Sequence, residues 1–239
     1  MSKRVARLRG TGDAAPSGRH RTDTEHIVNT PTHTGQVNRP RTRTLLAAAA
    51  LAGPFFYVSS ATQALTRPGF DIGVHPLSQL ATGTPGWIQQ VTFVLAGLGV
   101  VALAVAHRQL VTQGVGRRLV PIFLTVFGAG FVVAGLFTMD PQNSFPEGAP
   151  SGVVDMSWHS IVHTAAAALS FVALAGACVT LLVRHVRTRD VRPAVGNGLV
   201  ALVLLLPTSP TESSIQIAIT GLIAYTWVTV HALVLSRSA

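Results

Sequence analysis

The sequence predicts an all-α, polytopic membrane protein: a bundle of six transmembrane helices with both termini in the cytoplasm. Three observations lead to this fold class. The chain is 48% hydrophobic and only 11% charged, whereas a soluble domain carries about 25% charged residues. Its apolar residues form long, nearly charge-free runs of the length that crosses a bilayer. Its 18 lysines and arginines gather in alternate connections between those runs, as the positive-inside rule requires.

Residues 1–43 are rich in Arg, Thr, Pro, Gly and His and poor in large apolar side chains. Such a segment buries too little apolar surface to offset its ordering entropy, so we expect a disordered, basic, cytoplasmic tail. The tail is either a solvated topogenic segment or a contact for anionic lipid headgroups through Arg39, Arg41 and Arg43. Nucleic acid is not an expected partner, because membrane topology already accounts for the remaining basic residues in their short loops.

The transmembrane domain is expected over residues 44–237. Most of its apolar runs approach the ~20 residues that a helix needs to cross the hydrocarbon. They predict six spans, at about 45–65, 87–106, 119–139, 159–183, 195–207 and 215–235. The fifth run is short. If it re-enters instead of crossing, the chain has five crossings and its C-terminus lies outside.

The charges between the runs test this arrangement. The tail carries nine basic residues, the loop at 106–119 carries three, the loop at 183–195 carries four, and the C-terminus carries one. Arg67 is the single basic residue in the other three connections. This alternation predicts a multi-pass protein of the cell (inner) membrane, with the lipid bilayer as its main partner. The near-absence of lysine, with only Lys3 present, suggests a bacterial, GC-rich source.

Two outer connections carry the side chains that are capable of chemistry. The first, at residues 67–87, is expected to contain a short helix that begins at Pro76 and ends near Gly83. The second, at residues 137–163, ends with two histidines at the start of the fourth span. Together they supply the candidate ligand-binding residues: Asp71, His75, Ser78, Gln79, Asp140, Asp155, Trp158, His159 and His163.

His159 and His163 lie four residues apart, so on a helix both rings project from one face. Two imidazoles at this spacing can bind one metal ion such as zinc. A carboxylate from Asp71, Asp140 or Asp155, with His75, could complete the site. The alternative is a hydrogen-bonded network that holds the third and fourth spans together. His163 lies about a turn deep, so we expect it to have a partner inside the bundle. No catalytic residue is identified, since Ser78 and His75 lack the geometry of a triad.

Other features of the spans are expected to be structural. Small residues recur four positions apart and predict close helix packing, as in Ala48 with Ala52, Gly130 with Ala134 and Ala166 with Ser170. Among the histidines at the other ends of the spans, His107 and His185 are expected to be solvated and His231 to bond across helices.

The stretch FDIGVHPLSQLATGTPGWIQ at residues 70–89, with Asp140-Pro141, Trp158-His159 and His163, resembles the bacterial membrane family known as domain of unknown function 998. The resemblance covers roughly residues 45–235. It implies six-span proteins and carries no activity, substrate or catalytic residue.

The leading hypothesis is an integral membrane protein whose outer-facing Asp/His cluster binds an ion, a lipid headgroup or a small ligand. A looser similarity to seven-span metal-dependent hydrolases of the ceramidase and adiponectin-receptor type motivates one alternative, a metal-dependent membrane hydrolase that uses zinc-bound water. A structural or accessory subunit of a membrane complex is the other alternative.

Overall fold

The computed structural model describes residues 39–206 and 214–239. Over these two ranges the protein is helical and contains no β-strand. Its elements in chain order are α1 (Arg39–Thr66), the 3-10 helix η1 (Leu77–Ala81), α2 (Gly86–Leu110), α3 (Leu119–Leu136), α4 (Trp158–Arg187), α5 (Val191–Leu204) and α6 (Ser214–Ser236). The predicted tail up to residue 38 lies outside the described residues.

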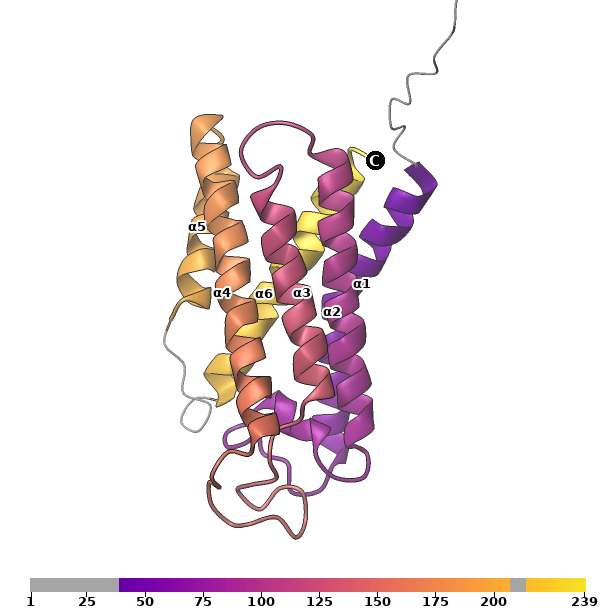
Figure 1. Ribbon diagram of the computed structural model, residues 1–239, viewed down its shortest axis with the longest axis vertical. Helices are drawn as coiled ribbons and strands as arrows, with labels where there is room; N and C mark the ends of the chain where they lie inside the picture. Colours follow the sequence, from indigo (N-terminus) through magenta and orange to yellow (C-terminus); the bar gives the residue numbers. More distant parts are fainter. Residues whose placement is uncertain (1–38, 207–213) are drawn as a thin grey trace, which may run out of the picture. The chain divides into compact units, whose positions relative to one another are not determined.

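Five helices are long and apolar enough to cross a membrane: α1, α2, α3, α4 and α6. The protein is therefore a multi-pass membrane protein. Helix α5 has only 14 residues, which cover about 21 Å of a hydrocarbon layer of about 30 Å. It spans 191–204 instead of the predicted 195–207. It leads from the end of α4 back toward the opposite end of the bundle, where α6 begins (Figure 1). A full sixth crossing stays a prediction.

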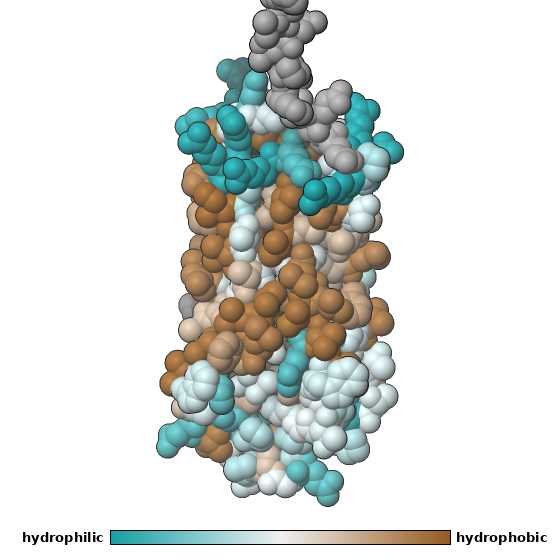
Figure 2. Space-filling model, turned by 45° about the vertical axis from the view of Figure 1, so that its right-hand side comes forward, coloured by the Kyte–Doolittle hydropathy of each residue, from teal (hydrophilic) through white to brown (hydrophobic). Residues whose placement is uncertain are grey.

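The bundle has two chemically different ends. The long connections at 67–85 and 137–157 lie together at one end, which we call the loop end (Figure 1). The start of α1, the C-terminus and the loop at 111–118 lie at the other, which we call the arginine end. A belt of hydrophobic side chains separates a strongly hydrophilic arginine end from a paler, mixed loop end (Figure 2). This belt is the surface that the bilayer hydrocarbon covers.

Helix α1 begins at Arg39, so the last five residues of the segment predicted as a disordered tail, 39–43, are helical. A transmembrane helix can extend beyond the hydrocarbon, and long arginine side chains reach outward from its end while their stems cover apolar surface. The helical boundary therefore precedes the first apolar residue of the span.

Neighbouring helices approach closely where the sequence places small residues. Helices α1 to α4 pack in chain order, α6 packs on α1, and α5 packs on α4. A Cβ added at Gly99 of α2 would lie 2.7 Å from the Cβ of Ala52 in α1. Gly130 of α3 contacts Ala166 and Ser170 of α4 in the same way. The predicted packing through small residues is thereby confirmed at these crossings.

The burial of His107 at the arginine end differs from the sequence-based prediction. His107, which was expected to be solvated, is only 1% exposed. Its Nδ1 lies 3.0 Å from Nε2 of His231, and the ring of Trp227 stacks on His231 at 4.8 Å. The expectation was wrong because α2 continues to Leu110 and not to residue 106, so His107 lies within the packed helix. The predicted cross-helix bond of His231 is confirmed.

Candidate functional site

Arg67 joins the two long connections of the loop end. Its guanidinium donates hydrogen bonds to the carbonyl oxygens of Leu80 (2.5 Å) and Thr82 (2.8 Å). Its Cζ atom lies 4.6 Å from the centre of the Phe145 ring, in a cation–π contact. Partial burial lowers the pKa of Arg67 from its ordinary value. The one basic residue of the outer connections is therefore used to dock loops, and it is not a free cation.

His75 also connects the two loops. Its Nδ1 accepts the main-chain N–H of Asp71 at 2.9 Å, so its proton is on Nε2, which donates to the carbonyl oxygen of Asn143 at 2.9 Å. The side chain is buried. Since both ring nitrogens are bonded to main-chain atoms, His75 acts as a structural bridge, and Asp71 turns its carboxylate to the N–H of Gly73.

Gln79 and Ser78 project from η1, which begins directly after Pro76 as the sequence predicts. The side-chain amide of Gln79 donates to the carbonyl oxygens of Gln142 (2.7 Å) and Phe145 (3.2 Å). Gln79 thus fastens η1 to the second loop. The hydroxyl of Ser78 donates to Sδ of Met139 at 2.9 Å.

Asp140 caps the fourth span. Its carboxylate accepts hydrogen bonds from the main-chain N–H and the hydroxyl of Ser157, both at 2.7 Å. Ser157 is the N-cap of α4, and its hydroxyl accepts from the N–H of Ser160. The pair ties the end of α3 to the start of α4. Asp155 and Trp158 are exposed, and Trp158 is the first residue of α4, a position typical of an interfacial tryptophan.

The two candidate histidines of α4 have different surroundings. The ring of His159 is exposed and packs on Trp158, with 3.6 Å between ring centres. His163 is buried, and its Nδ1 lies 2.8 Å from the carbonyl oxygen of Ala134 and 2.9 Å from that of Phe137. The expectation that His163 has a partner inside the bundle is confirmed. That partner is the main chain at the end of α3.

Within residues 39–206 and 214–239, no three His, Cys, Asp or Glu side chains come close enough together to hold a metal ion. The bonds of His75, Asp140 and His163 account for the separation, because each is turned toward a main-chain or capping partner. The structure therefore assigns no ligand set to zinc, and the metal-dependent hydrolase stays a prediction.

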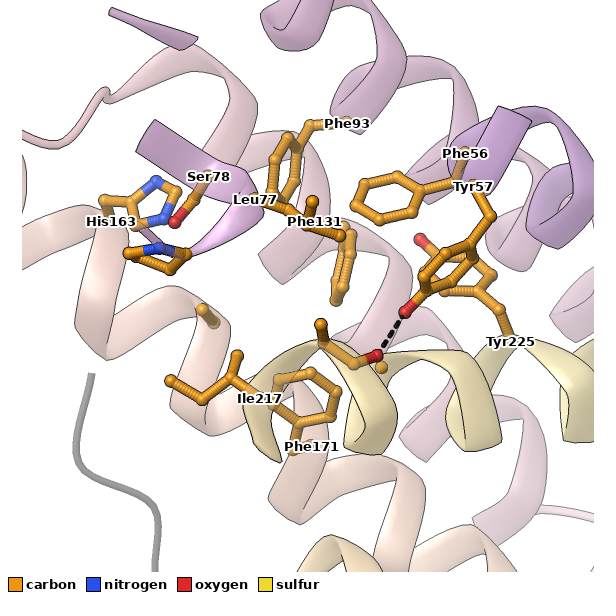
Figure 3. A pocket seen from close by; sticks show the side chains of 14 residues that line it. Phe56, Tyr57, Leu77, Ser78, Phe93, Phe131, His163, Phe171, Ile217 and Tyr225 are labelled. Carbon is orange, nitrogen blue, oxygen red and sulfur yellow. Dashed lines mark hydrogen bonds between the residues drawn. The ribbon is translucent and has the colours of Figure 1, made fainter. Parts of the chain in front are cut away.

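A cavity lies inside the loop-end half of the bundle (Figure 3). The space inside it that is open to the centre of a water molecule is about 70 Å³. Residues His163, Ala167 and Phe171 line it from one face of α4, over about 12 Å of helix axis at 1.5 Å per residue. The other walls come from η1, α1, α2, α3 and α6: Phe56, Tyr57, Pro76, Leu77, Ser78, Phe93, Phe131, Ile217, Ala218, Gly221 and Tyr225.

Aromatic rings build most of the cavity wall. Phe56 meets Phe93 edge to face at 5.1 Å and stacks on Tyr225 at 5.3 Å, and Phe93 stacks on Phe131 at 5.4 Å. Edge-to-face and offset contacts of this kind hold rings in fixed positions. The wall is therefore a rigid apolar surface contributed by four helices.

Polar groups lie at both ends of the cavity (Figure 3). Ser78 and His163 lie at its loop end, and the two tyrosines at its deep end. The hydroxyl of Tyr57 donates to the carbonyl oxygen of Ala218 at 2.8 Å. The hydroxyl of Tyr225 is buried and has no hydrogen-bond partner among the described residues.

Of the nine candidate residues, Ser78 and His163 line this cavity and the other seven do not. The aromatic lining was not predicted, because a phenylalanine within an apolar span has the same sequence signal whether it faces lipid, core or cavity. One weak signal exists in the last span, where Gly221 leaves room beside a large ring: a Cβ added there would lie 2.7 Å from the Tyr57 hydroxyl.

Comparison with known proteins completes the description of the site. Neither curated proteins nor solved structures include a significant match to the chain. A family model described as "Protein of unknown function (DUF998)" matches residues 50–234, which is more than half of the 239 residues. The matched region contains η1, both outer connections and every residue that lines the cavity. The chain belongs to this family of proteins of unknown function.

Proposed function

We propose that this membrane protein binds a ligand with a long apolar portion in the aromatic cavity that η1 closes at the loop end. The cavity itself is the observation that carries the proposal. Protein interiors are normally packed without voids larger than a water molecule. An unfilled space with rigid aromatic walls and a few polar groups has the construction of a small-molecule site.

The unpaired polar atoms support a ligand over a simple packing defect. Nearly all buried polar groups in proteins have hydrogen-bond partners, yet the Tyr225 hydroxyl has none among the described residues. The two hydrogen bonds of the His163 ring both involve Nδ1. Both residues line the same cavity. A bound molecule with a polar group at the loop end of the cavity would satisfy the ring of His163.

The distribution of arginine indicates which side of the membrane each end of the bundle faces. By the positive-inside rule, the arginine end faces the cytoplasm and the loop end faces the outside of the cell membrane. The cavity then lies at the depth of the outer leaflet. Lipids of that leaflet are the nearest source of ligands with long apolar portions. The proposed site lies one to three helical turns deeper than the surface Asp/His cluster, which the sequence suggested as a site for an ion or a headgroup.

The test is photo-crosslinking in liposomes with a bifunctional fatty-chain probe that carries a diazirine, followed by mass-spectrometric mapping of labelled peptides. We expect label on the cavity-facing parts of α4 and α6. Ala167→Trp fills the cavity from α4 and should remove most of that label. Ala165→Trp is the matched control, because Ala165 is exposed on the same helix and outside the cavity.

Equal labelling of the wild type and Ala167→Trp would contradict the proposal, as would label confined to peptides outside the cavity. Loss of label in both tryptophan variants would also contradict it, because the effect would then not depend on the cavity.

A further inference from the structure

The hydrogen bonds of His163 determine what its free nitrogen can do. Nδ1 faces two carbonyl oxygens, of Ala134 and Phe137. A carbonyl oxygen only accepts, so Nδ1 must carry the proton. No carboxylate of residues 39–206 or 214–239 lines the cavity, and a buried ring without a carboxylate partner is favoured in its neutral form. Nε2 therefore presents a lone pair, which is a hydrogen-bond acceptor.

Ser78 supplies a second acceptor at the same end of the cavity. Its hydroxyl proton is used in the bond to Sδ of Met139, which leaves the oxygen lone pairs of the Oγ atom. Ser78 and His163 lie together at the loop end of the cavity (Figure 3). A ligand group placed there meets acceptors from η1 on one side and α4 on the other.

The charge of the lining restricts the ligand further. Among the described residues, those that line the cavity include no Lys, Arg, Asp or Glu. Arg67, the arginine of the loop-end connections, donates hydrogen bonds to the carbonyl oxygens of Leu80 and Thr82 and lies over the Phe145 ring. A phosphate or carboxylate would be desolvated there without a cation, at a high cost in free energy. A neutral group that donates a hydrogen bond fits the site.

Within the described residues, α4 and α6 are separated, and α5, which contacts both helices, lies beside the gap. Helix α4 packs on α3 and α5 and helix α6 packs on α1, while α4 and α6 make at most a marginal contact with each other. A second hollow lies between α4, α5 and α6, and it shares Phe171 and Ile217 with the cavity. Exposed apolar side chains border this side, among them Val172 and Ile219. Phe171 and Ile217 therefore form an apolar boundary between this hollow and the cavity.

We propose that the ligand is a neutral lipid with a hydroxyl head group, which enters from the bilayer between α4 and α6 and donates its hydroxyl proton to Nε2 of His163. This inference rests on the proposed function, because it names the ligand class of the same cavity. The hydroxyl lies at the loop end beside Ser78, and the chain extends along Phe171 toward Tyr225.

The experiment compares three competitors with one chain and three head groups: oleyl alcohol, oleyl methyl ether and oleate. Each competes with the photo-crosslinking probe for wild-type protein in liposomes. The alcohol donates a hydrogen bond, the ether only accepts, and oleate is anionic. A buried acceptor left without its donor weakens binding by about ten- to a hundredfold, so we expect the alcohol to compete at least about tenfold better than both other compounds.

The variant His163→Asn tests the nitrogen. The asparagine amide can donate to the carbonyls of Ala134 and Phe137 as Nδ1 does, but it leaves no acceptor at the position of Nε2. We expect the preference for the alcohol to fall to about twofold or less. The exposed His159 is the matched control, and His159→Asn should keep the full preference. Reaction of the buried Cys178 with a thiol dye on heating shows whether each variant is folded.

The outcomes separate the two proposals. Equal competition by the three compounds, or strongest competition by oleate, overturns the assignment of a neutral hydroxyl lipid and leaves the apolar cavity as a binding site. A preference that persists in folded His163→Asn overturns the role of Nε2. Competition by none of the three, with specific labelling also absent, overturns the proposed function itself.

Discussion

The two tyrosines of the cavity allow the same atom to be removed in two different environments. The Tyr225 hydroxyl is buried and has no partner among the described residues. Burying a hydroxyl without a hydrogen bond costs about 1–3 kcal/mol. Tyr225→Phe removes that oxygen and keeps the stack on Phe56 at 5.3 Å. We therefore expect the variant to stabilise the ligand-free protein by about 1 kcal/mol, whereas most substitutions destabilise.

Tyr57→Phe is the matched control, since these are the only two tyrosines of the chain. The Tyr57 hydroxyl donates to the carbonyl oxygen of Ala218 at 2.8 Å, and losing such a bond costs about 0.5–1.5 kcal/mol. The same chemical change thus has opposite expected signs at the two positions. The free energies of unfolding of the two variants should differ by about 2 kcal/mol.

Cys178 provides the assay. It is the single cysteine and is fully buried in α4, so a thiol-reactive dye reports unfolding of delipidated protein in detergent. For a chain of this size, 1 kcal/mol shifts Tm by about 2–4 °C. We expect Tyr225→Phe to melt above the wild type and Tyr57→Phe below it. If both variants melt below the wild type by the same amount, the Tyr225 hydroxyl has a partner, and the reasoning about an unsatisfied cavity is refuted.

Three further predictions concern the framework around the cavity. His75→Ala removes two part-buried hydrogen bonds of the loop-end connections and should destabilise the protein by about 2–3 kcal/mol. The metal content measured by elemental analysis should not change, and a loss of bound metal would show that His75 is a ligand. Gly99→Val inserts bulk at the α1–α2 crossing and should cost about 1–3 kcal/mol, and unchanged melting in the thiol-dye assay would disprove the close contact. In a Cys178→Ala background, a membrane-impermeant thiol label applied to intact cells should react with cysteine at Ser144 and miss cysteine at Arg117, and the reverse pattern would invert the proposed sidedness.

Much of the framework could be read from the chain. Apolar runs located α1, α2, α3, α4 and α6 within a few residues, because burial in hydrocarbon requires continuous apolar stretches of fixed length. Small residues located the helix crossings, and Pro76 marked the start of η1. The boundaries of α5 and the burial of His107 were less accessible, because a helix can continue past the apolar run that identifies it.

The candidate site shows where sequence reasoning ends. The residue types and the depth of His163 indicated that it needs a partner, but not that main-chain carbonyls would hold Nδ1 and leave Nε2 toward a cavity. His159, four residues away with the same chemistry, is exposed. Spacing along one helix places two rings on one face, whereas hydrogen bonding depends on the neighbouring chain segments. The Asp/His residues were therefore recognised as a group before their separate roles could be known.

Sequence alone determined the membrane class, the approximate spans, the concentration of arginine at one end and the polar character of the other. These properties follow from the cost of placing charge and unpaired backbone in hydrocarbon, and that cost acts on each segment independently. Only the tertiary structure decided that aromatic rings from α1, α2, α3, α4 and α6 surround an unfilled space, and that α4 and α6 stand apart beside it. A cavity is a property of the gaps between segments, so no single segment contains the information that defines it.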